Sequence, residues 1–81
     1  MKKLVIFSAE AWCSSCKSLK ESLNKTTLNL PIEIVDVDQD HNAVQEYSIR
    51  SVPTLLLMQD NQVIKRKTGT MKPDELLKFI E

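Results

Sequence analysis

Residues 3–17, KLVIFSAEAWCSSCK, decide the fold, because they pass from a buried strand into a helix that starts with two cysteines. The apolar, β-branched run Lys3–Ser8 is typical of a strand that is covered on both faces. From Cys13 to about Lys25, apolar residues recur at helical spacing with charged residues between them. We therefore expect a strand, a short connection and a helix whose first turn carries both cysteines.

The rest of the sequence predicts three more strands and two more helices. The segment Asp38–Asp40 offers cap chemistry for the first of these helices, and Pro73 suits the first turn of the second. Leu76, Leu77 and Ile80 are expected to form the apolar face of that last helix. The expected elements are a strand at Ile32–Val37, a helix at Asn42–Tyr47, a hairpin of Thr54–Met58 and Gln62–Lys67 around Asp60-Asn61, and a helix from Pro73.

This order, β-α-β-α-β-β-α, predicts an α/β fold with a four-stranded mixed sheet flanked by three helices. A strand–helix–strand start favours a parallel pair with a right-handed crossover, and the hairpin adds antiparallel strands. At 81 residues, the chain is expected to be a single domain over residues 1–81.

Charge and hydropathy argue against two classes of partner. Lys plus Arg and Asp plus Glu number eleven each, so no net field attracts nucleic acid or a membrane. The longest basic run, Lys65–Lys67, is interpreted as a solvated edge strand protected by charge. The apolar stretch Leu4–Phe7 is shorter than the core of a signal peptide, about 7–15 residues. We expect a cytoplasmic, monomeric protein with no nucleic-acid or membrane partner.

The spacing of Cys13 and Cys16 suits redox chemistry. Residues three apart on a helix have Cβ atoms about 5–6 Å apart, and a disulfide needs about 3.5–4.5 Å, so a slight tightening closes the bond. Cys13 lies where unpaired N–H groups and the helix dipole favour a thiolate, which predicts the nucleophile. Cys16, on the apolar face, is expected to stay protonated, to be less accessible and to act as the resolving cysteine. A C-x-x-C motif near a βαβ pattern indicates a thioredoxin-like redox site.

A zinc site and a structural disulfide explain the two cysteines less well than a redox site does. A structural zinc site needs four ligands, and beyond carboxylates only Cys13, Cys16 and His41 are available. His41 is interpreted as a surface residue near a helix start. A purely structural disulfide is disfavoured by its small loop and by a reducing compartment. No Gly-rich phosphate loop is present, which argues against a built-in nucleotide or flavin site. Together with the shortage of zinc ligands, this leads us to expect no metal and no cofactor.

Two separated motifs give a resemblance to a known family. Residues 11–17, with Trp12-Cys13-Ser14-Ser15-Cys16, resemble the thioredoxin signature Trp-Cys-Gly-Pro-Cys-Lys, and residues 47–57 resemble the stretch that holds the thioredoxin cis-proline. The resemblance covers nearly the whole chain. It implies a thioredoxin fold and a dithiol–disulfide oxidoreductase.

The resemblance also implies a substrate-binding surface. Pro53 is expected to be a cis-proline that faces the cysteines, and the backbone of Val52 to pair with an extended substrate segment. Trp12 is expected to shape the docking surface, and Gly69 to let a partner's backbone approach closely.

The sequence departs from the thioredoxin pattern at several places. The strand and helix that usually precede Lys3–Ser8 are missing, which gives a core of glutaredoxin length. The acid that thioredoxins bury is replaced by Ile6 or Phe7, and the lysine of the next strand by Ile34. The proton of the resolving cysteine then goes to water, to the other cysteine or to Glu10. Around the thiolate, the usual Gly-Pro is replaced by hydroxyls, and the expected neighbours are Ser14, Ser15 and Lys17.

The first functional hypothesis is a cytosolic dithiol electron carrier that reduces disulfide-containing protein substrates. Its cysteines are expected to be restored by a thioredoxin-reductase-like enzyme or by a low-molecular-weight thiol. A glutaredoxin-like, glutathione-dependent reductase is an alternative, although Gly69-Thr70 replaces the usual Gly-Gly pair. A non-catalytic thioredoxin-fold binding or accessory subunit is another, and an oxidase or isomerase would reverse the direction of the chemistry.

Overall fold

The strand before the cysteine motif lies inside a four-stranded sheet. The computed structural model, which describes residues 1–81, pairs β1 (Lys2–Ser8) in parallel with β2 (Ile32–Asp36) and antiparallel with β3 (Thr54–Gln59). The strand β4 (Gln62–Thr68) pairs with β3, so the strand order is β2-β1-β3-β4. The predicted mixed sheet is confirmed.

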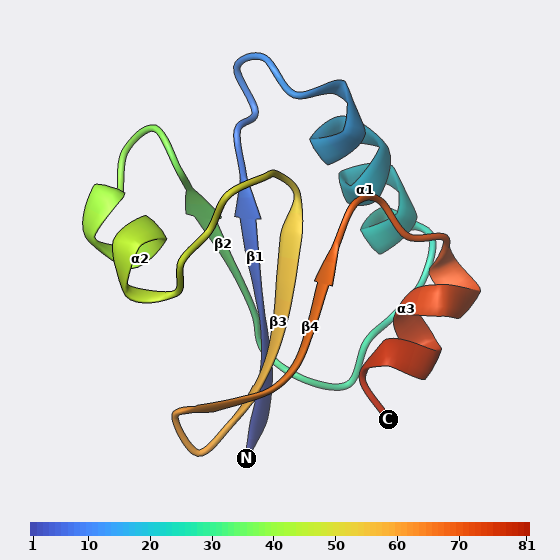
Figure 1. The fold of residues 1–81 in the computed structure, drawn as a ribbon. Helices are drawn as coiled ribbons and strands as arrows, with labels where there is room; N and C mark the ends of the chain where they lie inside the picture. Colours follow the sequence, from blue (N-terminus) through green and yellow to red (C-terminus); the bar gives the residue numbers. More distant parts are fainter.

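Three helices cover this sheet. The helices α1 (Ser14–Asn24) and α3 (Pro73–Phe79) lie over one face, and α2 (His41–Glu46) lies over the other (Figure 1). Asp40 caps α2, because its carboxylate accepts a hydrogen bond of 3.0 Å from the N–H of Ala43. None of these helices is long and apolar enough to cross a membrane.

The central strand β1 supplies side chains to two apolar layers, because successive strand residues point to opposite faces. Leu4 and Ile6 pack on the side of α1 and α3, whereas Val5 and Phe7 pack on the side of α2. This explains why β1 is a continuous apolar run rather than an alternating one. The buried members of the first layer are Leu4, Ile6, Leu19, Leu55, Met71 and Leu76, and those of the second are Val5, Phe7, Val35, Leu56 and Met58.

The predicted apolar face of α3 is wrong at Leu77. Leu76 is fully buried, whereas Leu77 is 45% exposed. Each residue of a helix turns about 100° from the last, so a short helix that touches the core along a narrow stripe buries one of two adjacent leucines. Phe79 and Ile80, three and four residues after Leu76, complete the stripe.

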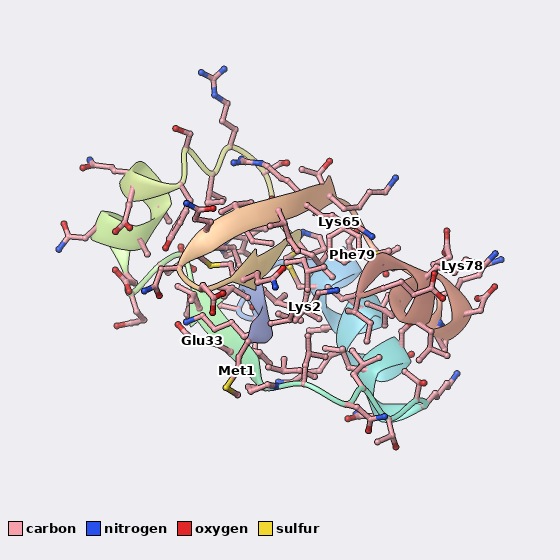
Figure 2. All side chains as sticks on the ribbon, turned by 90° about the horizontal axis from the view of Figure 1, so that it is seen from below. Met1, Lys2, Glu33, Lys65, Lys78 and Phe79 are labelled. Atoms are coloured by element: carbon pink, nitrogen blue, oxygen red, sulfur yellow. The ribbon has the colours of Figure 1, made fainter.

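The basic edge strand β4 also satisfies the ends of two helices. Every residue of β4 is exposed, as predicted for a solvated edge. Lys65 donates to the carbonyls of Phe79 (3.2 Å) and Glu81 (3.0 Å) at the end of α3, and Figure 2 shows Lys65 beside Phe79. Arg66 points to the other face and donates to the carbonyls of Tyr47 and Ser48 after α2. Cations at helix C-termini are favourable, so the basic run links the hairpin to both helix layers.

Candidate active site

Cys13 is the N-cap residue of α1. Its backbone is extended (φ −100°, ψ 107°), and the helix begins at Ser14. The N–H of Cys16 donates to the Cys13 sulfur at 3.2 Å, and the N–H of Cys13 donates to the carbonyl of Ala9 at 2.9 Å. An N-cap side chain accepts from the unpaired N–H groups of the first turn. The Cys13 sulfur therefore lies where a backbone donor and the helix dipole stabilise a negative charge.

Cys16 lies one turn deeper, beside Cys13. Burial, above all, raises the pKa of the Cys16 thiol to about 11, and Cys13 and the Glu10 carboxylate act in the same direction. Cys16 is therefore a neutral thiol at neutral pH. Cys16 is less accessible than Cys13, as predicted, but the difference is small, because Cys13 is 7% and Cys16 is 5% exposed. The two cysteines differ in the stabilisation of their thiolates rather than in exposure.

The segment before β3 lies against Cys13. The start of α1 and the start of β3 are at the same end of the sheet (Figure 1). The thiol of Cys13 donates to the carbonyl of Val52 at 3.8 Å, and the Val52–Pro53 peptide bond is cis, as the resemblance implied. The N–H of Gly69 donates to the carbonyl of Pro53 at 2.8 Å. Gly69 has φ +93°, a conformation that favours glycine, and its Cα faces open space.

Trp12 forms one wall of a groove beside the cysteines. Its side chain is 65% exposed, and its indole N–H donates to the carboxylate of Asp38 at 3.1 Å. The sequence offered Asp38 only as part of the capping segment Asp38–Asp40; in the structure Asp40 caps α2, whereas Asp38 binds Trp12. The groove has a volume of about 270 Å³ and is lined by Trp12, Val37, Val44, Ile49, Arg50, Ser51 and Val52.

The residues expected around the thiolate make no hydrogen bond to its sulfur. Ser14, Ser15 and Lys17 are exposed, and none of their side chains hydrogen-bonds to either sulfur. These side chains follow Cys13 on the outer side of the first turn, whereas the sulfur turns inward toward the helix N-terminus. The donor to Cys13 is thus the backbone and not the hydroxyls that replace the usual Gly-Pro.

The structure also decides which residue replaces the acid that thioredoxins bury. Ile6 and Ile34 line a pocket next to Cys16, whereas Phe7 lies in the layer against α2. Ile6 is therefore the replacement, and Ile34 takes the place of the family's lysine on the adjacent strand. Neither side chain can accept a proton from Cys16.

His41 does not join the cysteines in a metal site. It is the first residue of α2 and is exposed, as predicted. No group of three or more His, Cys, Asp or Glu side chains is arranged to hold a metal ion.

The fold and the cysteine pair at the start of α1 define a thioredoxin-fold protein with a dithiol site, and comparison with known sequences agrees. A sequence model of the thioredoxin family matches residues 1–81. The thioredoxin of Chlamydia trachomatis is 38% identical over 80 residues, which cover 95% of this chain and 78% of that protein. The chain therefore belongs to the thioredoxin family and is a thiol–disulfide oxidoreductase. Disulfide-containing proteins are the kind of substrate on which this family acts.

Solved structures agree with this assignment. A point mutant of the Halobacterium salinarum thioredoxin superimposes with a TM-score of 0.89 at 28% identity, covering 99% of this chain and 72% of that one. Thioredoxin-2 of a malaria parasite also gives a TM-score of 0.89, over 99% of this chain and 81% of that one. At 21% identity, this second likeness concerns the fold alone.

Proposed function

We propose that residues 1–81 form one monomeric domain that carries electrons to protein disulfides in the cytoplasm. The observation that carries the proposal is the position of the Cys13 sulfur, at the N-cap of α1 and 3.2 Å from a backbone N–H. The Cys13 thiolate attacks one sulfur of a substrate disulfide, forms a mixed disulfide and releases the other sulfur as a thiolate. Cys16 then attacks Cys13, and the second substrate sulfur leaves. Two electrons pass to the substrate, and the Cys13–Cys16 disulfide remains.

The surroundings of Cys13 support the binding of an extended substrate segment. The backbone of Val52 lies against the Cys13 thiol, where a strand laid across the site would present its disulfide. The groove beside Trp12 provides room for the side chains of that strand. On the other side, the open space at the Gly69 Cα lets a partner's backbone approach.

The oxidised pair needs a source of electrons, either a thioredoxin-reductase-like enzyme or a low-molecular-weight thiol. The exposed, apolar wall at Trp12 favours docking of a protein partner. Turnover with a reductase, or with a thiol other than glutathione, supports the electron carrier, whereas turnover that specifically requires glutathione supports the glutaredoxin-like alternative.

Replacing both cysteines separates chemistry from binding. Cys13→Ser together with Cys16→Ser is expected to lower insulin-disulfide reduction to the uncatalysed rate, because no sulfur remains to form a mixed disulfide. Ser18→Ala, at an exposed position of the same helix, is the control and is expected to keep wild-type turnover. A double variant that stays folded and still reduces insulin would contradict the proposal. Insulin turbidity measures the reaction, and circular dichroism checks the fold.

A further inference from the structure

A small pocket lies behind Cys16, on the side away from the groove at Trp12. Its volume is about 10 Å³, close to what a single water molecule needs. Its polar lining comes from the end of β1, from the β1–α1 connection and from α1. The residues that matter for its chemistry are Ser8, Glu10, Cys16 and Lys20.

Cys16 must lose a proton before it can attack the mixed disulfide, because the thiolate is the nucleophile. With a pKa raised to about 11, very few Cys16 thiols ionise unaided at neutral pH. Besides Cys16 itself, the ionisable side chains that line this pocket are Glu10 and Lys20. During resolution, the Cys13 sulfur is bonded to the substrate and is not available as a base.

The two sheet strands next to the pocket supply no ionisable group. From β1 come Ile6 and Ser8, and from β2 comes Ile34. The ammonium of Lys20 is a cation and pairs with the Glu10 carboxylate. Glu10 is therefore the one anionic acceptor at this pocket.

Two observations support Glu10 as the acceptor of the Cys16 proton. The ion pair ties the carboxylate, on the connection after β1, to Lys20 on α1, the helix that also carries Cys16. Ser8 is 5% exposed, lines the same pocket, and its hydroxyl has no hydrogen-bond partner in the protein. A buried hydroxyl without a partner normally holds a water. The hydroxyl of Ser8, the Glu10 carboxylate and the Cys16 thiol give such a water three polar neighbours.

We propose that Glu10 receives the proton of Cys16 through a water at this pocket when the mixed disulfide is resolved. The inference rests on the proposed function and adds the base for its second step. The Cys16 S–H proton passes to the water, and a proton of that water passes to the carboxylate. The Cys16 thiolate then bonds to the Cys13 sulfur as the bond from Cys13 to the substrate breaks, and the substrate leaves as a thiolate.

A purely electrostatic role for Glu10 predicts the opposite result. The negative charge of Glu10 disfavours the Cys16 thiolate, so its removal would ease ionisation and speed the resolving step. A proton acceptor, in contrast, contributes to the rate of that step, so its removal slows it. The sign of the change in rate therefore distinguishes the two roles.

The test compares Glu10→Gln with Glu33→Gln. Glu33 is a matched control, because it also pairs with a lysine, Lys3 (3.5 Å), and is about as exposed as Glu10. The reduced proteins are mixed rapidly with oxidised glutathione and quenched with acid, and mass spectrometry follows the glutathione mixed disulfide. Its formation reports attack by Cys13, and its decay reports resolution by Cys16.

With Glu10→Gln we expect formation at the wild-type rate and decay about 100-fold slower, the lower end of what a positioned base supplies. Glu33→Gln is expected to match the wild type in both phases. Glu10→Asp is expected to recover part of the lost decay rate. The difference in decay rate between Glu10→Gln and the wild type is expected to narrow as the pH approaches 11, where hydroxide ionises Cys16 directly.

Two results would overturn the inference. Decay in Glu10→Gln that is as fast as in the wild type, or faster, makes Glu10 an electrostatic neighbour only. If the wild-type protein forms no mixed disulfide at all, the proposed function itself fails. Failure of the Glu10 inference and failure of the proposed function therefore give different results in this experiment.

Discussion

The Cys16→Ser variant, when mixed with a protein that contains a disulfide, is expected to accumulate as a covalent mixed disulfide, with close to one substrate chain bound per molecule of the variant. Cys13 keeps its place at the N-cap of α1 in this variant, and the backbone N–H of position 16 still donates to its sulfur. The first attack therefore proceeds, but no thiol remains to release the substrate.

Cys13→Ser is expected to trap almost nothing under the same conditions. The remaining thiol is 5% exposed, and burial is the main reason for its raised pKa, so the fraction of thiolate at neutral pH is on the order of a thousandth or less. Non-reducing electrophoresis and intact-mass measurement count the complexes of both variants. Equal trapping would contradict the assignment of Cys13 as attacker and Cys16 as resolver.

Leu76→Ala is expected to lower the free energy of unfolding by about 2–5 kcal/mol, the cost of removing a fully buried leucine side chain. An 81-residue chain has a total stability of roughly 4–12 kcal/mol, so this single change unfolds a large part of the population if the wild type is at the lower end. Urea denaturation followed by circular dichroism measures the effect as a shift of the midpoint.

Leu77→Ala is the matched control for this prediction. It makes the same chemical change in the same helix, so the difference in helix propensity cancels, but Leu77 is 45% exposed. Its expected cost is within about 0.5 kcal/mol. Equal costs for the two variants would mean that α3 does not pack on the sheet through Leu76.

The elements that the sequence predicted well are those with strong local signals. The apolar run Lys3–Ser8 corresponds to β1 to within one residue. The turn at Asp60-Asn61 has φ of 51° and 72°, the positive values that these residues tolerate. The helix at the cysteines begins at Ser14, and Cys13, where the sequence placed its start, is the N-cap residue.

The features that the sequence did not reveal depend on contacts between distant segments. The choice between Ile6 and Phe7 needed the structure, because neighbouring strand residues face opposite layers and a shift of one residue exchanges them. The bond from Trp12 to Asp38 spans 26 residues, so no local pattern indicates it. By contrast, the backbone donor to the Cys13 sulfur is local, three residues along the chain, and the position of Cys13 at the helix start predicted it.

The measurement that tests the central claim most directly is the reduction potential of the Cys13–Cys16 pair, obtained by equilibration with defined thiol–disulfide buffers. A cytosolic electron carrier of the thioredoxin family is predicted to have a potential of about −270 mV, where the dithiol reduces protein disulfides that have higher, more oxidising potentials. A potential of about −180 to −120 mV would contradict the account, because such a pair oxidises or isomerises its substrates.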